Sequence, residues 1–212
     1  MGFGLLLMGY FTANMMALNS LGGVFSLVGY IIVLIAAKKL SQYNQSFFSL
    51  VICSIAMIAL SAFGAFIDVS TFLYNYALIP MQIIGQYLSN IFSAVSLLFN
   101  LAFTAILCFS VKSIATETGA TKIVIASIRN FIFFCLYFVL QMIVLVSYLS
   151  GNTALLGFVA STAIPLWMVL VNIICMVLIC WMLFCCYSGI CDSEDAQKTV
   201  EIPKLSFFKR KK

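Results

Sequence analysis

Polar residues recur at helical spacing along one otherwise apolar segment of the chain. The intervals between them are 4, 3, 4, 3, 4 and 4 residues, with a mean of about 3.7, close to the helical repeat of about 3.6. A single helix face therefore carries them all. This face, called here the polar stripe, comprises Gln82, Gln86, Ser89, Ser93, Ser96, Asn100 and Thr104.

Hydroxyl and amide side chains in such a stripe support two kinds of chemistry inside a membrane. They can hydrogen-bond neighbouring helices, with each bond contributing about 0.6–2 kcal/mol. They can also form one wall of a water-filled or ligand-binding cavity. The continuity of the stripe over residues 82–104 raises the case for a cavity, and the sequence leaves both interpretations open.

Two later segments carry thinner faces of the same kind. One face comprises Asn130, Tyr137, Gln141 and Tyr148, and the other comprises Gly157, Ser161, Pro165, Met168 and Asn172. Asn100, Gln141 and Asn172 fall near the middle of their apolar segments, where an amide without a hydrogen-bond partner costs several kcal/mol. We therefore predict that the three helices meet around a shared polar interior.

Asp68 is the only acidic residue between Met1 and Lys112. An ionisable residue within a membrane span is by default a candidate for function. Asp68 falls at the predicted outer end of its span, where water reaches it. Its carboxylate is expected to be either an interfacial charge or a contact for an ion or substrate.

The chain offers little for catalysis. It has no His to act as a base, and its apolar segments hold no paired carboxylates for a metal or for acid–base chemistry. A Ser–Lys dyad would need a Lys at membrane depth, and the apolar segments contain none. We therefore expect neither an enzyme nor a metal or cofactor site.

The composition defines the elements that carry these residues. Of 212 residues, 64% are hydrophobic and 8% are charged, whereas soluble domains average about 25% charged. Since a membrane-spanning helix needs about 20 apolar residues, the sequence predicts an all-α polytopic transmembrane bundle in one domain, residues 1–187. The predicted spans are residues 2–18, 20–37, 46–67, 86–111, 123–149 and 155–187. Residues 2–18 would be only about 25 Å long as a helix, and five spans remain if they lie in the interface.

The basic residues predict the orientation, because short loops rich in Lys and Arg stay in the cytoplasm. With the tail inside, the segments 38–45 and 112–123 are inside, while 68–80 and 150–153 are outside. All 11 Lys and Arg then lie in or beside cytoplasmic segments. We expect a multi-pass protein of the cell membrane with a cytoplasmic C-terminus. Six spans also put the N-terminus in the cytoplasm, and five put it outside.

Small residues predict where helices approach one another closely. Gly22, Ser26, Gly29 and Ala36 share one face of the second span, and Ser61 and Ala65 form a pair on the third. We interpret both as packing seams rather than binding sites. Between the fourth and fifth spans, Gly119 suits the position just after a helix end.

The tail, residues 188–212, is acidic first and basic last. Basic residues gain about 1 kcal/mol each near an anionic leaflet, and Phe inserts at the interface. The tail is therefore predicted to anchor on anionic lipid headgroups, with nucleic acid excluded as a partner. The anchor residues are Phe207, Phe208, Lys209, Arg210, Lys211 and Lys212.

Two functions fit these observations. The polar stripe favours a non-enzymatic transport component, either a small-molecule permease subunit or a substrate-binding membrane component. Other membrane subunits or an ATPase would then be its partners, and its substrate would be neutral or amphipathic. The scarcity of charged residues within the membrane favours instead a membrane assembly, scaffold or regulatory protein without a transport pathway. The same scarcity argues against transport coupled to protons.

Overall fold

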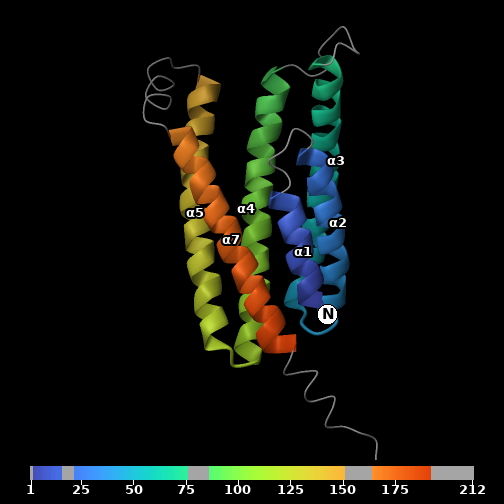
Figure 1. Ribbon diagram of the computed structural model, residues 1–212, viewed down its shortest axis with the longest axis vertical. Coiled ribbons are helices and arrows are strands. Elements are labelled where there is room, and N and C mark those ends of the chain that lie inside the picture. Colours follow the sequence, from blue (N-terminus) through green and yellow to red (C-terminus); the bar gives the residue numbers. More distant parts are fainter. Residues whose placement is uncertain (1, 16–21, 76–85, 151–163, 192–212) are drawn as a thin grey trace, which may run out of the picture.

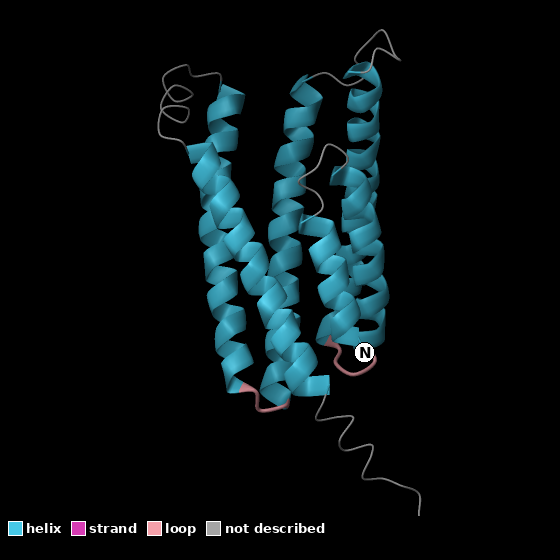
Figure 2. Ribbon diagram, viewed as in Figure 1, coloured by secondary structure: helices cyan, strands magenta, loops and turns pink. Residues whose placement is uncertain are grey.

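The computed structural model describes residues 2–15, 22–75, 86–150 and 164–191. The helices are α1 (Gly2–Met15), α2 (Gly22–Leu40), α3 (Ser46–Asn75), α4 (Gln86–Glu117), α5 (Thr121–Ser150), α7 (Ile164–Cys186) and the π-helical turn η2 (Tyr187–Cys191). The described residues contain no strand (Figure 2), so the predicted all-α fold is confirmed. Five of the helices, α2, α3, α4, α5 and α7, are long and apolar enough to cross a membrane.

The six α-helices form a closed ring in chain order. Each α-helix packs against the next one along the chain, and α7 packs against α1 to complete the ring. Consecutive helices run antiparallel (Figure 1). A ring of this kind encloses an interior, and the residues that fill it decide whether the bundle is solid or hollow.

The first helix is the short member of the ring. α1 has 14 residues, about 21 Å at 1.5 Å per residue, against a hydrocarbon core of about 30 Å. Its residues Phe3, Leu6, Tyr10 and Ala13 are almost completely buried, so α1 belongs to the bundle interior. It begins beside the end of α2 and ends part-way along the bundle (Figure 1). It is not among the helices long enough to span, and positions 16–18 of the predicted first span lie outside the described residues.

One end of the bundle, called here the basic end, carries every Lys and Arg of the described residues. The turns at 41–45 and 118–120, the start of α1 and the end of α7 all lie at this end (Figure 1). Lys38 and Lys39 occupy the last turn of α2, Lys112 lies near the end of α4, and Lys122 and Arg129 lie near the start of α5. The two turns predicted to share one side of the membrane therefore lie together.

Hydrogen bonds fix the two turns at the basic end. Gly119 has a φ of +71°, and Ala120 donates its N–H to the carbonyl of Ala115 at 2.8 Å. This pattern ends α4 as the sequence predicted for a glycine after a helix. At the other turn, Asn44 Nδ2 donates to Glu117 Oε1 at 2.7 Å, which ties the start of α3 to the end of α4.

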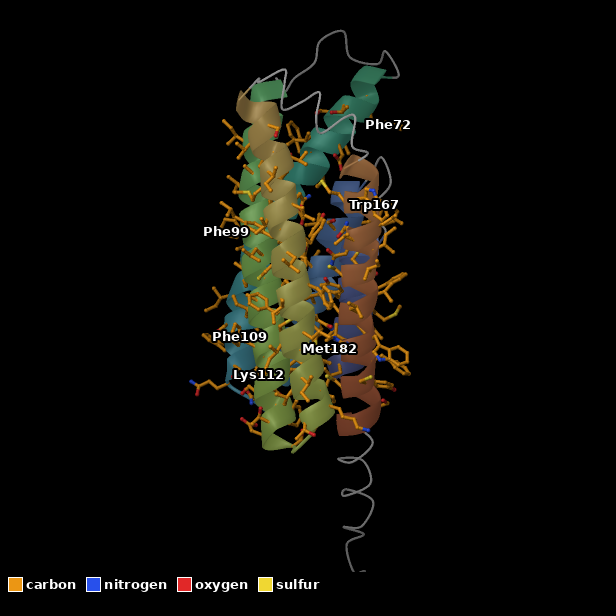
Figure 3. The ribbon with its side chains drawn as sticks, turned by 90° about the vertical axis from the view of Figure 1, so that its left-hand side faces the viewer. Phe72, Phe99, Phe109, Lys112, Trp167 and Met182 are labelled. Carbon is orange, nitrogen blue, oxygen red and sulfur yellow. The ribbon has the colours of Figure 1, made fainter. Side chains whose placement is uncertain are left out.

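The outer surface of the bundle is apolar. Phe99, Phe109 and Trp167 project outward from α4 and α7 (Figure 3), and each is at least 39% exposed. In water this surface would drive aggregation, whereas lipid solvates it. The arrangement agrees with a membrane protein whose polar residues face inward.

Two glycines of α2 allow close helix contacts. A Cβ on Gly29 would fall 2.6 Å from the Cβ of Ala13 in α1, and a Cβ on Gly23 would fall 2.5 Å from the backbone nitrogen of Ala65 in α3. Real side chains do not approach so closely, so only glycine fits at either position. The predicted packing role of these small residues is confirmed for Gly29 and Ala65.

Candidate functional site

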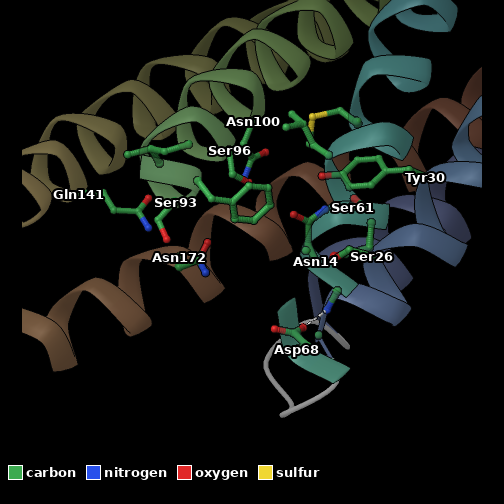
Figure 4. Close-up of a pocket in the computed structure, with 18 of the residues that line it drawn as sticks. Asn14, Ser26, Tyr30, Ser61, Asp68, Ser93, Ser96, Asn100, Gln141 and Asn172 are labelled. Carbon is green, nitrogen blue, oxygen red and sulfur yellow. Dashed lines mark hydrogen bonds between the residues drawn. The ribbon is translucent and has the colours of Figure 1, made fainter. Parts of the chain in front are cut away.

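Among its described residues, the ring surrounds a cavity of about 470 Å³ that is open to the outside, in the half of the bundle away from the basic end. All six α-helices contribute to its wall. Its size lies within the usual range of about 300–1,000 Å³ for small-molecule sites. Polar residues of the wall, most of them labelled in Figure 4, are Asn14, Ser26, Tyr30, Ser61, Asp68, Ser93, Ser96, Asn100, Tyr137, Gln141 and Asn172.

The polar stripe supplies the wall formed by α4. Ser93, Ser96 and Asn100 line the cavity, because spacings of three and four residues place them on one side of the helix. Thr104, the next residue of the stripe, is fully buried below the cavity, and its Oγ1 has no hydrogen-bond partner within the described part of the chain. Gln86 and Ser89 lie in the first turns of α4, and Gln82 lies outside the described residues.

The three amides predicted to meet do line the same cavity. Gln141 of α5 and Asn172 of α7 contribute to its wall together with Asn100 of α4. Figure 4 shows Gln141 and Asn172 on either side of Ser93. The predicted meeting of α4, α5 and α7 around a polar interior is therefore present in the fold.

Only part of the polar face predicted for α5 lines the cavity. Tyr137 and Gln141 line it. Asn130 lies closer to the basic end, where its Nδ2 donates to the carbonyl of Leu178 at 2.8 Å. Asn130 therefore forms a hydrogen bond that holds α5 against α7. The side chain of Tyr148 lies outside the described part of the structure.

The opposite wall comes from helices whose polar residues the sequence did not assign to a site. Asn14, Ser26, Tyr30 and Ser61 lie on α1, α2 and α3 around the other side of the cavity. Ser26 Oγ donates to the carbonyl of Ala13 at 2.8 Å, so it also serves the packing role predicted for its face. No periodic signal marked this wall, since its polar residues are thinly spread over three helices.

Asp68 closes one end of the cavity and is the only charged residue in its described wall. Its Oδ2 accepts the backbone N–H of Gly23 at 2.7 Å, in the first turn of α2. A carboxylate at a helix N-terminus is stabilised by the unpaired N–H groups and the helix dipole. Asp68 thus has a structural role as the cap of α2, while its position also leaves it in contact with the cavity.

Several polar groups of the wall are not satisfied by the protein. The side chains of Ser96, Asn100 and Asn172 have no hydrogen-bond partner within the described part of the chain, and Gln141 Oε1 is buried without one. Only Gln141 Oε1 is fully buried, and such a group is almost always paired with protein, water or ligand, whereas Ser96, Asn100 and Asn172 are part-exposed. The wall therefore presents donors and acceptors suited to water or to a polar solute.

The cavity ends where the interior becomes apolar. Tyr30 lines the cavity, and its ring packs edge-on against that of Phe103 with the ring centroids 5.3 Å apart. Beyond Phe103, the fully buried side chains of Leu107, Val33 and Ile179 fill the ring toward the basic end. Among the described residues, one half of the bundle surrounds a polar cavity and the other half is filled by apolar side chains.

The remaining site predictions fall elsewhere. The anchor residues 207–212 lie outside the described residues. The described part of the chain brings together no group of three His, Cys, Asp or Glu residues that would hold a metal ion. The cavity therefore offers hydroxyl, phenol and amide groups with a single carboxylate, which is chemistry for binding.

Comparison of the chain with known protein families, with curated proteins and with solved structures finds no match in any of the three.

Proposed function

We propose that this protein is a non-enzymatic transport component, a permease subunit or substrate-binding membrane component, whose cavity receives a small solute. The observation that carries the proposal is the polar cavity to which all six described α-helices contribute. Asn100 and Asn172 are part-exposed amides without a hydrogen-bond partner in the described protein, and a protein that only holds helices together gains nothing from such amides. A solute or water in the cavity would satisfy them.

The wall favours a neutral or amphipathic solute. Hydroxyl and amide groups face the cavity beside apolar side chains such as Met57, Phe92 and Met176. Pockets that combine apolar contacts with a few directed polar groups are typical of small-molecule sites. An anion would find no basic side chain in the described wall and would meet the carboxylate of Asp68.

The proposed orientation places the basic end in the cytoplasm and the cavity in the outer half of the membrane. The clustering of Lys38, Lys39, Lys112, Lys122 and Arg129 supports it, because basic residues are retained on the cytoplasmic side. With the start of α1 at the same end, both termini are cytoplasmic.

A Cys probe at Thr116 should stay unlabelled by an impermeant reagent in intact cells, and one at Asn152 should react. Labelling of both from one side would contradict the orientation.

Thermal unfolding of the purified protein tests binding. Each measurement adds one candidate solute: glycerol, a hexose, a nucleoside, an amino acid or choline. We expect one class of solute to raise the unfolding temperature of the wild type and of Val95→Leu, a lipid-facing control. Asn100→Leu should lose that rise, since it removes polar groups from the wall. A rise that persists in Asn100→Leu, or no rise with any solute, would contradict the proposal.

Transport is tested by uptake of the stabilising solute into proteoliposomes, with and without candidate partner subunits or an ATPase. Uptake that depends on Asn100 would support the transport component. Binding without uptake under every condition would favour the alternative, a membrane assembly or regulatory protein.

A further inference from the structure

A second concave site lies at the basic end, between α5 and α7. It is a groove of about 620 Å³, and it shares no described residue with the polar cavity. Lys122 and Arg129 of α5 form one side, and Trp181 and Cys185 of α7 form the other. Residues 122 and 129 are seven positions apart, nearly two helical turns, so both lie on the same face of α5.

Arg129 carries a positive charge well inside the bundle's length. It follows Thr121, the first residue of α5, by eight positions, or about 12 Å along the helix. Arg129 is exposed, and a long basic side chain near a helix end extends toward the headgroup level, where an anionic group is a suitable partner. The described carboxylates are engaged elsewhere, because Glu117 accepts a hydrogen bond from Asn44 and Asp68 caps α2 at the far end. Within the described residues, neither Lys122 nor Arg129 forms an ion pair.

The rest of the groove is apolar. Ala126 lies between the two basic residues on α5, and Met182 forms the buried floor beside Trp181. Trp181 is 62% exposed, and exposed Trp near a helix end is typical of the membrane interface. The groove therefore combines two cations with an apolar wall in one elongated site at the level of the lipid headgroups.

We propose that this groove binds an anionic phospholipid, with the headgroup phosphate between Lys122 and Arg129 and the first methylenes of an acyl chain against Ala126, Met182 and Trp181. The planar guanidinium of Arg129 matches two phosphate oxygens at once. Basic pockets between membrane helices on the cytoplasmic side suit such headgroups. The acidic residues Asp192, Glu194 and Asp195 of the tail follow η2 directly, so the tail is the competing occupant that the experiment below distinguishes from a lipid.

Lipid retention on the full-length protein, measured by native mass spectrometry, tests this assignment. The protein is exchanged into mixed micelles that contain equal phosphatidylglycerol and phosphatidylcholine. We expect the wild type to retain phosphatidylglycerol, and the affinity to fall about fivefold for each cation removed in Lys122→Gln and Arg129→Gln. Lys39→Gln is the matched control, an exposed cation at the same end but on α2, and it should bind as the wild type does.

Four results would overturn the assignment. The first is equal retention by wild type and the Lys122→Gln/Arg129→Gln double variant, and the second is an equal loss in Lys39→Gln. The third is a large gain in retention after Asp192→Asn, Glu194→Gln and Asp195→Asn, which would identify the tail as the occupant. Millimolar glycerol phosphate should not displace the lipid, because it lacks the acyl chain; displacement would indicate a site for soluble phosphate instead.

Discussion

The two halves of the ring use the same six described helices but differ in how exposed their polar side chains are, since Ser54, Ser110 and Ser127 are buried and Ser96 and Asn100 are part-exposed. In the half at the basic end, Ser54, Ser110 and Ser127 each donate to a backbone carbonyl, among fully buried Leu and Phe side chains. In the cavity half, Ser96 and Asn100 have no such partner within the described residues. Stability and binding are thus expected to reside in different halves, although the same α4 passes through both.

The short first helix accounts for much of this difference. α1 fills the ring at the basic end with Phe3, Leu6 and Tyr10. Its last described turn reaches the cavity wall at Ala13 and Asn14. The longer α3, with 30 residues or about 45 Å, continues past the level of the cavity. Within the described residues, α1 therefore contributes its packed side chains mainly to the basic-end half, and only its last turn contributes to the cavity wall.

The largest predicted effect is on stability in the solid half. Phe103→Ala should lower the free energy of unfolding by about 3–5 kcal/mol, because the ring is fully buried and packs against Tyr30. Thermal or denaturant unfolding in detergent measures the change. A loss below about 1 kcal/mol would mean that this half is not tightly packed and would weaken the contrast.

Two glycine substitutions compare a tight helix contact with the open cavity wall at the same level of the bundle. Gly29→Ala should destabilise by about 1–3 kcal/mol, because the new Cβ would overlap Ala13 of α1. Gly64→Ala on the cavity wall should change stability by less than about 0.5 kcal/mol, since its Cβ would meet only the ring of Phe92 at 3.4 Å. Similar losses in the two variants, measured by unfolding, would argue against a roomy cavity at Gly64.

A small effect on stability is also predicted for Asn100, one of the amides of the cavity. Asn100→Leu should change the free energy of unfolding by about 1 kcal/mol or less, because Asn100 makes no hydrogen bond within the described protein. Asn130→Leu should cost more, since it removes the hydrogen bond from α5 to Leu178. Unfolding curves of the two variants compare them directly, and a larger loss for Asn100 would contradict the distinction.

The sequence predicted the features that depend on composition and on helical periodicity. Apolar length identified the long helices, and the placement of Lys and Arg identified the turns that share one end. The spacing of Ser93, Ser96 and Asn100 predicted one face of α4, and the cost of unpaired amides predicted that Gln141 and Asn172 would join it.

Features that depend on long-range geometry were not predictable. Asp68 caps the N-terminus of α2 across 45 positions of sequence, and no local pattern marks such a contact. Asn14, Tyr30 and Ser61 line the cavity only because α1 and α7 pack together and close the ring. Composition does not encode that contact. Thr104 shares the periodicity of the stripe but lies below the cavity, because the interior becomes solid one turn beyond Asn100.

Cysteine reactivity along α4 tests whether water reaches the cavity in the polar half of the bundle. The starting chain has its eight native Cys replaced. Single Cys residues are then introduced on the cavity wall at Ser93, Ser96 and Asn100. Control Cys residues replace Leu107 in the solid half and Val95 and Leu98 on the lipid face. A small water-soluble thiol reagent should modify positions 93, 96 and 100 and spare 95, 98 and 107. Equal reactivity at positions 100 and 107, or none at 93, 96 and 100, would contradict the account.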